Sequence, residues 1–233
     1  MEILIDGYYR ATEAEVYIAS FCGQHKDAQH IQDNGLLSQW RAYGTGGGFA
    51  IVFDARKLWE LLKEEAERFQ ADAVHLSDCV YSDDEDILKR EFAKDIRTLS
   101  ESARDFARRR LCRELNQDDQ KTLYRRSLWP FVHCCSRYKH RGFKEENEVR
   151  LVVAPASLRA VKDGTISITR KSRYKNGECI PYISLFDSTG IEPAMERVIV
   201  GPHREKDARA AALRVMLGTR EIEVTCSDIP FVG

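Results

Sequence analysis

The sequence lacks the apolar run of roughly 18–20 residues that a helix needs to cross a bilayer. Its first residues, Met1 to Asp6, also lack the basic region and apolar core of a secretory signal. The seven cysteines are odd in number, and they form neither a CxxC pair nor the spacing of a zinc site. These absences argue against a membrane-spanning, secreted or metal-binding protein. We expect reduced thiols and a cytoplasmic location.

An excess of charge of either sign is also missing. The chain has 36 lysines and arginines and 37 aspartates and glutamates, for a formal net charge of −1. The overall charge therefore gives no reason to expect binding to nucleic acid or to a membrane surface. With 233 residues, of which 43% are hydrophobic and 31% charged, the chain has the composition of a globular protein with a sizeable core.

Strand and helix signals follow one another without strict alternation. Apolar runs of strand length predict strands at residues 15–22, 49–53, 73–81, 146–153, 165–169, 180–185, 197–200 and 221–225. Helical spacing predicts helices at residues 36–43, 55–70, 84–115, 118–138 and 204–217, and a polar loop is expected at 23–35. This order predicts an α+β protein with a mixed, mostly antiparallel sheet, flanking helices and a helical lobe near 84–138. We expect a single domain over residues 1–233.

The most informative segment is an acidic run that leads into an apolar strand, from Glu146 to Val153. In a strand, alternate side chains share a face. If the strand begins at Glu146, the side chains of Glu146, Glu148 and Arg150 point to one side. Two carboxylates and a guanidinium then lie together, either as a chemical site or as an ion-pair ladder.

Several blocks of the sequence form a recognisable pattern with this strand. One of them, Leu36 to Gly44, reads Leu-Leu-Ser-Gln-Trp-Arg-Ala-Tyr-Gly. The others are Ile18–Cys22, Gly48–Asp54, Glu145–Val153, Val198–Pro202 and Cys226–Phe231. Together they resemble the bacterial domain-of-unknown-function family 2971, over about residues 14–233. Members usually begin with an additional segment containing Asn-Asp-Pro-Phe-like elements, so this chain is expected to be a short member or to lack that segment.

Two short elements are similar to those of ADP-ribosyltransferases, which use NAD as a substrate. Glu146-Asn147-Glu148 resembles their Glu-x-Glu element, and Ser20-Phe21-Cys22 resembles their Ser-x-Ser element. The resemblance implies that Glu148 stabilises the positive charge that develops on the ribose, as a carboxylate is suited to do. It further implies that Glu146 assists the acceptor and that Ser20 orients Glu148 by a hydrogen bond.

The same elements depart from the enzyme pattern in two places. Cys22 stands in place of the second serine, and no arginine or histidine on an earlier strand fills the role that those enzymes give to one. The alternative is a strand whose outer face carries Glu146, Glu148 and Arg150 as solvated or cross-strand ion pairs.

An aromatic and basic group lies on the predicted short helix. Trp40 and Tyr43 are three residues apart and are expected to share a face, while Arg41 projects elsewhere on the same helix. Such a group can stack a base or a nicotinamide and pair with a phosphate, for which Arg150 is a second candidate. The alternative is an aromatic anchor that packs the helix on the sheet.

A segment without acidic residues runs from Gln120 to Lys144, and its cations alternate with aromatic side chains. Such a segment can follow a nucleic-acid backbone and stack bases. It can equally be a helix face that balances the acidic residues 83–86. The side chains expected to contact nucleic acid are those of Arg125, Arg126, Arg137, Lys139 and Arg141.

Two functional hypotheses follow from these patterns. The first is a nucleotide- or NAD-using transferase of ADP-ribosyltransferase-like type, with no tightly held cofactor. The second is a nucleic-acid-binding or protein-interaction module that uses the basic 120–144 face. Neither hypothesis involves a membrane.

Overall fold

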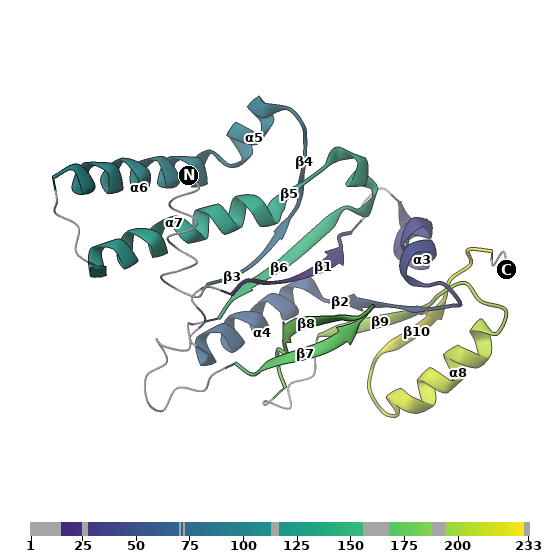
Figure 1. The fold of residues 1–233 in the computed structure, drawn as a ribbon. Coiled ribbons are helices and arrows are strands. Elements are labelled where there is room, and N and C mark those ends of the chain that lie inside the picture. The colour runs from purple at the N-terminus through teal and green to yellow at the C-terminus, as the bar shows by residue number, and fades with distance from the viewer. Residues whose placement is uncertain are drawn as a thin grey trace. The chain divides into compact units, whose positions relative to one another are not determined.

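The strand that carries the acidic run is the centre of a three-stranded sheet (Figure 1). This strand, β6 (Glu148–Ala154), pairs on one side with β1 (Tyr17–Cys22) and on the other with β3 (Ala73–Asp78), both antiparallel. Its β-branched residues suit a strand that packs on both sides. Leu151, Val152 and Val153 are buried, and they form the core of this sheet.

The computed structural model describes residues 15–24, 28–69, 71, 73–112, 117–155, 168–187 and 194–230, without the side chains of 117–121 and 123–125. The chain divides into two compact units. The first contains Met1–Cys22 and Glu65–Leu185, and the second contains Gly23–Glu64 and Phe186–Gly233. We describe each unit by itself.

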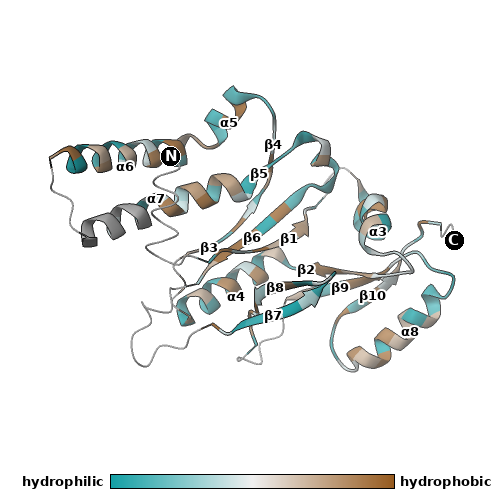
Figure 2. Ribbon diagram, viewed as in Figure 1, coloured by the Kyte–Doolittle hydropathy of each residue, from teal (hydrophilic) through white to brown (hydrophobic). Residues whose placement is uncertain are grey.

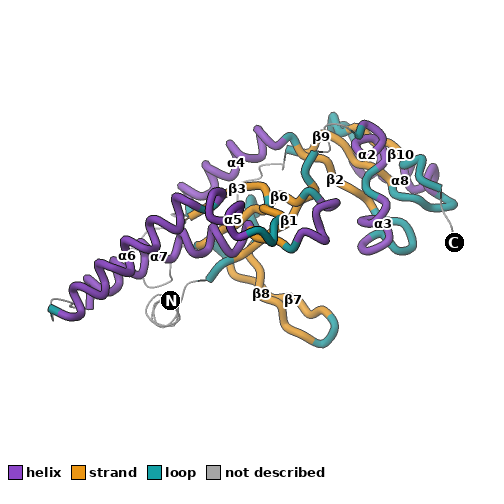
Figure 3. The backbone as a smooth tube through the Cα atoms, turned by 90° about the horizontal axis from the view of Figure 1, so that it is seen from above, coloured by secondary structure: helices purple, strands orange, loops and turns teal. Residues whose placement is uncertain are grey.

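The first unit contains the predicted helical lobe. It consists of α5 (Glu85–Glu91), α6 (Ala93–Leu111) and α7 (Gln117–Arg137), and Figures 1 and 3 show α6 and α7 side by side. The prediction of one continuous helix from residue 84 was wrong at Phe92, where α5 ends and α6 begins. Phe92 is buried and Arg137 stacks over its ring, so packing of this side chain overrides the helical pattern of the neighbouring sequence.

Short elements connect the lobe to the sheet. The two-residue strand β4 (Val80–Tyr81) pairs in parallel with β5 (Tyr138–Lys139), and the 3₁₀ helix η1 (Arg141–Glu146) leads into β6. A separate hairpin, β7 (Arg170–Lys175) and β8 (Glu178–Ile183), projects from the unit in Figure 3, and Figure 2 shows β7 to be hydrophilic. Of the strand predicted at 165–169, residues 165–167 lie outside the described residues, and the observed strand begins at Arg170.

The second unit is built on a sheet of three strands in the order β10 (Glu223–Cys226), β9 (Met195–Val200) and β2 (Phe49–Phe53). The parallel pair β9 and β10 is connected through α8 (Lys206–Leu217), as parallel strands require. Val200, Ala210, Leu217 and Val224 form the core between this helix and the sheet.

Three helices precede this sheet or follow its first strand. They are α2 (Gln29–Asn34), α3 (Leu37–Tyr43) and α4 (Ala55–Arg68), which begins in the second unit and ends in the first. The prediction of a polar loop at 23–35 was wrong where α2 lies. This helix buries no residue, so its sequence has no apolar stripe by which it could have been recognised.

The fold class predicted from the sequence is confirmed. Among the strands that the structure describes, four pairings are antiparallel and two are parallel, and the helices are not in βαβ alternation with the strands. The protein is therefore α+β, with a mixed and mostly antiparallel strand arrangement and a helical lobe.

Candidate functional site

Glu148 is the first residue of the central strand of the first unit. The prediction that the strand starts at Glu146 was wrong, because Glu146 ends the 3₁₀ helix η1. Between them, Asn147 has a left-handed backbone with φ of 43°, which short polar side chains tolerate best. The two glutamates are therefore not held on one face by strand alternation.

A lysine brings the two glutamates together instead. The Lys139 Nζ atom lies 2.5 Å from Oε2 of Glu146 and 2.5 Å from Oε2 of Glu148. Its side chain is only 17% exposed, and that of Glu148 only 6%. The acid pair is thus a recessed ion cluster in which one cation is shared by two carboxylates.

Arg150 completes the cluster from the next position on the same face of β6. Its Nε atom donates to Oε1 of Glu148 at 2.8 Å, and its Nη1 atom donates to the Ser136 carbonyl at 2.6 Å. Arg150 and Glu148 are two residues apart, so the alternation of side chains in a strand places them together. The predicted juxtaposition of these two residues is confirmed.

The neighbouring strand β1 contributes a hydroxyl. Ser20 lies opposite Arg150 in the antiparallel register, and Cys22 lies opposite Glu148. Both residues are exposed, and the Ser20 side chain hydrogen-bonds to Glu148. The carboxylate therefore receives hydrogen bonds from Lys139, Arg150 and Ser20, and the exposed β1 residues form the open side of the cluster.

These contacts fix the charge of Glu148. Burial by itself would raise the pKa of the carboxyl group, but hydrogen bonds from Arg150, Lys139 and Ser20 and the charge of Arg150 lower the pKa from 4.5 to about 2. The same carboxylates raise the pKa of Lys139 against the opposing effect of burial. Glu148 is an anion over the whole physiological range, so it suits charge stabilisation and not proton transfer near neutral pH.

The backbone of Glu148 is held as firmly as its side chain. Its N–H donates to the Tyr81 hydroxyl at 2.7 Å, and its carbonyl accepts from the Cys79 N–H at 2.9 Å. Tyr81 and Lys139 are direct partners in the β4–β5 strand pair, although they are almost 60 positions apart in the sequence. No local periodicity in the sequence marks such a pairing, and the roles of Lys139 and Tyr81 were therefore missed.

A histidine pair lies between the sheet and the lobe, next to Arg150. His75 on β3 has its Nε2 atom 3.4 Å from the Ser136 hydroxyl, and its ring centroid is 4.8 Å from that of His133. The Nδ1 atom of His133 lies 2.8 Å from Asp95. Burial and the neighbouring His133 lower the pKa of His75 to about 4, so this ring is neutral at pH 7. The cluster joins α6, α7 and β3 behind the ion cluster.

The second unit contains the aromatic group, and Trp40 is buried in it. Its side chain is 8% exposed, and the indole Nε1 donates to the Asn34 carbonyl at 2.8 Å. A Cβ atom added at Gly201 would lie 2.8 Å from the indole ring, so the ring fills the space above this glycine. These contacts favour the alternative in which Trp40 is a packing anchor.

Arg41 and Tyr43 differ from Trp40 in their surroundings. Both are exposed, and Tyr43 has 80% of its surface in solvent, so Trp40 and Tyr43 do not form one aromatic face. These residues belong to the second unit, whereas Glu148 belongs to the first. Participation of Trp40, Arg41 or Tyr43 in a shared substrate site stays a prediction.

The basic 120–144 segment is tied to its own unit. Arg126 lies 3.8 Å from Glu101, and Arg141 lies 2.7 Å from Asp83. Arg137 donates to the Asp78 carbonyl, while Lys139 is part of the ion cluster. The side chain of Arg125 lies outside the described residues. The Arg141–Asp83 pair agrees with the view that this segment balances the acidic residues 83–86, and its binding to nucleic acid stays a prediction.

The comparisons with known proteins agree with the resemblance seen in the sequence. Residues 39–151 match the family described as "Protein of unknown function (DUF2971)". This segment includes most of the Leu36–Gly44 block and the acidic strand, and the resemblance to family 2971 is confirmed over it. No curated protein matches the chain. No solved structure matches it.

Proposed function

We propose that this protein is a transferase of ADP-ribosyltransferase-like type that acts on NAD or a related nucleotide, with Glu148 as its central residue. The observation that carries the proposal is the state of this carboxylate. It is recessed, permanently ionised, and oriented by hydrogen bonds from Ser20, Lys139 and Arg150. Cleavage of a glycosidic bond to nicotinamide develops positive charge on the ribose, and a preorganised anion stabilises such charge.

The two cations beside Glu148 have a second role in the proposal. Among the described residues, three of the five N–H donors of Arg150 serve Glu148 and the Ser136 carbonyl, which leaves two donors for a phosphate. Lys139 and Arg150 retain 17% and 18% exposed side chains. A bound pyrophosphate would share these cations with the carboxylate. Glu148 would then be less fully neutralised, and its negative charge would interact more strongly with the ribose.

Glu146 and Ser20 take subordinate roles. The Glu146 side chain is 26% exposed, against 6% for Glu148, so Glu146 is the carboxylate that an acceptor can approach. Ser20 contacts Glu148 from β1 and fixes its orientation. Supporting hydrogen bonds of this kind hold a charged side chain of a site in one rotamer. Arg41 remains a proposed phosphate partner that belongs to the second unit.

The test is the release of nicotinamide from NAD by the purified full chain. Glu148→Gln keeps the size of the side chain and removes its charge, and we expect a loss of about 100- to 1000-fold in turnover. Glu145→Gln is the matched control, because Glu145 is an exposed glutamate in η1, the 3₁₀ helix that precedes Glu148. Equal turnover of the two variants, or no turnover by the unchanged protein on NAD or on a panel of other nucleotides, would refute the proposal.

A further inference from the structure

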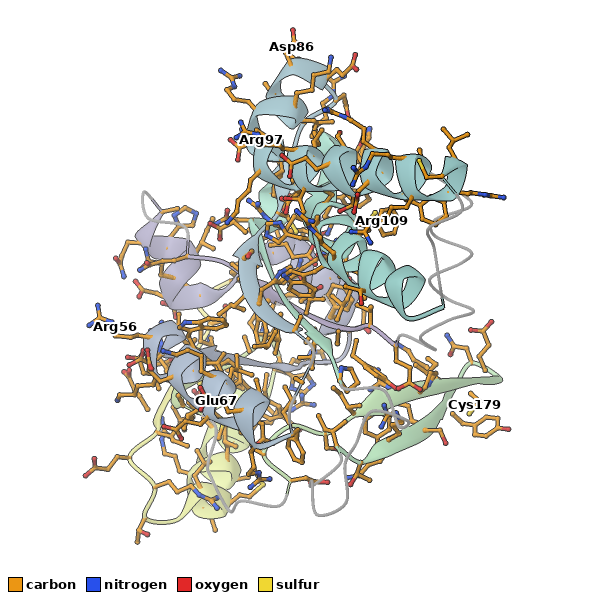
Figure 4. The ribbon with its side chains drawn as sticks, turned by 90° about the vertical axis from the view of Figure 1, so that its left-hand side faces the viewer. Arg56, Glu67, Asp86, Arg97, Arg109 and Cys179 are labelled. Atoms are coloured by element: carbon orange, nitrogen blue, oxygen red, sulfur yellow. The ribbon has the colours of Figure 1, made fainter. Side chains whose placement is uncertain are left out.

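The outer face of α6 carries a row of cations that the proposed transferase activity does not use. Lys94, Arg97, Arg104 and Arg108 are all exposed. At 3.6 residues per turn they fall within an arc of about 80° around the helix, away from the buried Ser102. We name these four residues the α6 stripe. Figure 4 labels one of them, Arg97, near the start of the helix.

The acidic residues of α6 leave the stripe positively charged. Asp95 points to His133, and Asp105 is shared by Arg108 and Arg109. Glu101 is the only acidic residue within the arc, and it lies near Arg126. The helix as a whole has six basic and three acidic residues, a net charge of +3, in a chain whose net charge is −1. Positive charge is therefore concentrated on this element.

Three of these cations make no contact that holds the described part of the fold together. Among the described residues, the side chains of Lys94, Arg97 and Arg104 have no ion-pair or hydrogen-bond partner. Arg126, Arg137, Lys139 and Arg141 in the basic 120–144 segment contrast with them, because each contacts a group of its own unit. The charges of Lys94, Arg97 and Arg104 are available to an external partner, and Arg108 shares its charge with Asp105.

The geometry points to a linear polyanion. Lys94 and Arg108 are 14 positions apart, so the stripe is about 21 Å long, which corresponds to about six base pairs of duplex. Three of its four residues are arginines, which bind phosphate oxygens through two donors at once. Thr98, Ser100 and Ala107, which flank the stripe, are small or polar. The exposed Leu111 beside its C-terminal end is a single apolar residue and not the apolar face by which a helix inserts into a lipid surface.

We propose that the α6 stripe binds the phosphodiester backbone of a nucleic acid, without base specificity. The proposal is independent of the transferase activity, since none of its residues belongs to the Glu148 cluster. Four phosphate contacts predict that the logarithm of the association constant falls with the logarithm of salt concentration with a slope of about −3 to −4 for duplex DNA. Affinity would thus fall about 100-fold between 50 and 200 mM salt.

The experiment measures fluorescence anisotropy of a labelled 20-nucleotide RNA, the corresponding DNA strand and its duplex, against the full chain at several salt concentrations. The test variant replaces Lys94, Arg97 and Arg104 by glutamine. The control variant replaces Arg56, Lys57 and Arg204 by glutamine, which changes the net charge equally at exposed positions elsewhere. Helix content from circular dichroism verifies that both variants are folded, and glutamine has nearly the helix propensity of lysine and arginine.

We expect the test variant to bind at least about 10-fold more weakly at low salt and to lose about 2 to 3 units of the salt slope. The control variant should keep the affinity and slope of the unchanged protein. The three probes show whether RNA, single-stranded DNA or duplex is preferred. Equal affinity of the two variants would overturn the proposal. So would equally tight binding to vesicles with 20% phosphatidylserine that depends on the same three residues, because the partner would then be an anionic membrane.

Discussion

At the scale of single residues, the main feature is the buried and neutralised carboxylate of Glu148. Glu148 is among the few charged residues that are buried, and burial of an unpaired charge would cost several kcal/mol. This cost is offset because Lys139 and Arg150 neutralise the negative charge of Glu148 and Ser20 donates a further hydrogen bond to it. A buried ion cluster of this kind is weak evidence for a role in stability, which agrees with the proposal that Glu148 has a chemical role.

Replacement of Lys139 by methionine tests the shared cation. The variant leaves Glu146 and Glu148 facing each other without the lysine, so we expect the free energy of unfolding to fall by about 2 to 3 kcal/mol at pH 7. Urea denaturation provides the measurement.

Lys144→Met is the control for this variant. Lys144 is exposed in η1, the 3₁₀ helix that contains Glu146, and its loss should change stability by less than about 0.5 kcal/mol. Similar losses in both variants would show that Lys139 is not a buried bridge.

The sequence predicted part of this residue pattern and not the rest. Side-chain alternation was sufficient to place Glu148 beside Arg150, and the resemblance to ADP-ribosyltransferases implied the contact between Ser20 and Glu148. Alternation failed for Glu146, because a left-handed Asn147 interrupts the strand. Lys139 was beyond prediction, since its position depends on a two-residue strand pairing that leaves no periodic signal.

At the scale of helices and strands, elements with a strong apolar pattern were predicted nearly to the residue. Examples are β2, α4 and α8. The misplaced elements have weak or misleading patterns. The apolar pattern of α5 and α6 predicts one helix, although the buried Phe92 separates the two. The helix α2 has no buried face at all. Tertiary packing decides such cases, and local sequence does not record it.

The start of α4 shows a local signal that was sufficient. Asp54 directly precedes this helix in the sequence, and its Oδ1 atom accepts hydrogen bonds from the N–H groups of Arg56 and Lys57 at 2.9 and 3.0 Å. These bonds lower the pKa of Asp54. An N-cap aspartate satisfies N–H groups that the first turn of a helix leaves without partners.

We expect Asp54→Ala to lower the free energy of unfolding by about 1 kcal/mol, because alanine cannot accept these bonds. Asp54→Asn should retain most of the stability, since its side-chain oxygen still caps the helix. Thermal unfolding followed by circular dichroism compares the two variants. Equal loss in both would mean that charge and not capping is the contribution of Asp54.

At the scale of the whole molecule, the Glu148 cluster and the α6 stripe lie in the same compact unit. Trp40 belongs to the second unit. Nothing in the described part of the chain is a helix long and apolar enough to span a bilayer. The nearly balanced composition of the chain conceals a positively charged α6, so net charge was a poor guide to local electrostatics.

The lowered pKa of Glu148 has a consequence for the stability of the fold. Because the folded state holds the carboxylate more tightly than the unfolded chain does, its contribution is present above about pH 4.5. It is lost as the pH falls from 4.5 toward the folded pKa of about 2. The contribution is of the order of 3 kcal/mol, from the size of the shift.

The most direct test of the account is an NMR titration of the Glu148 side-chain carboxyl carbon, assigned by its absence in Glu148→Gln. We predict that its chemical shift stays constant from pH 7 down to about pH 3.5, where an ordinary glutamate is already mostly protonated. A titration midpoint at or above 4.5 would contradict the ionised, cation-bound carboxylate on which the proposed chemistry depends.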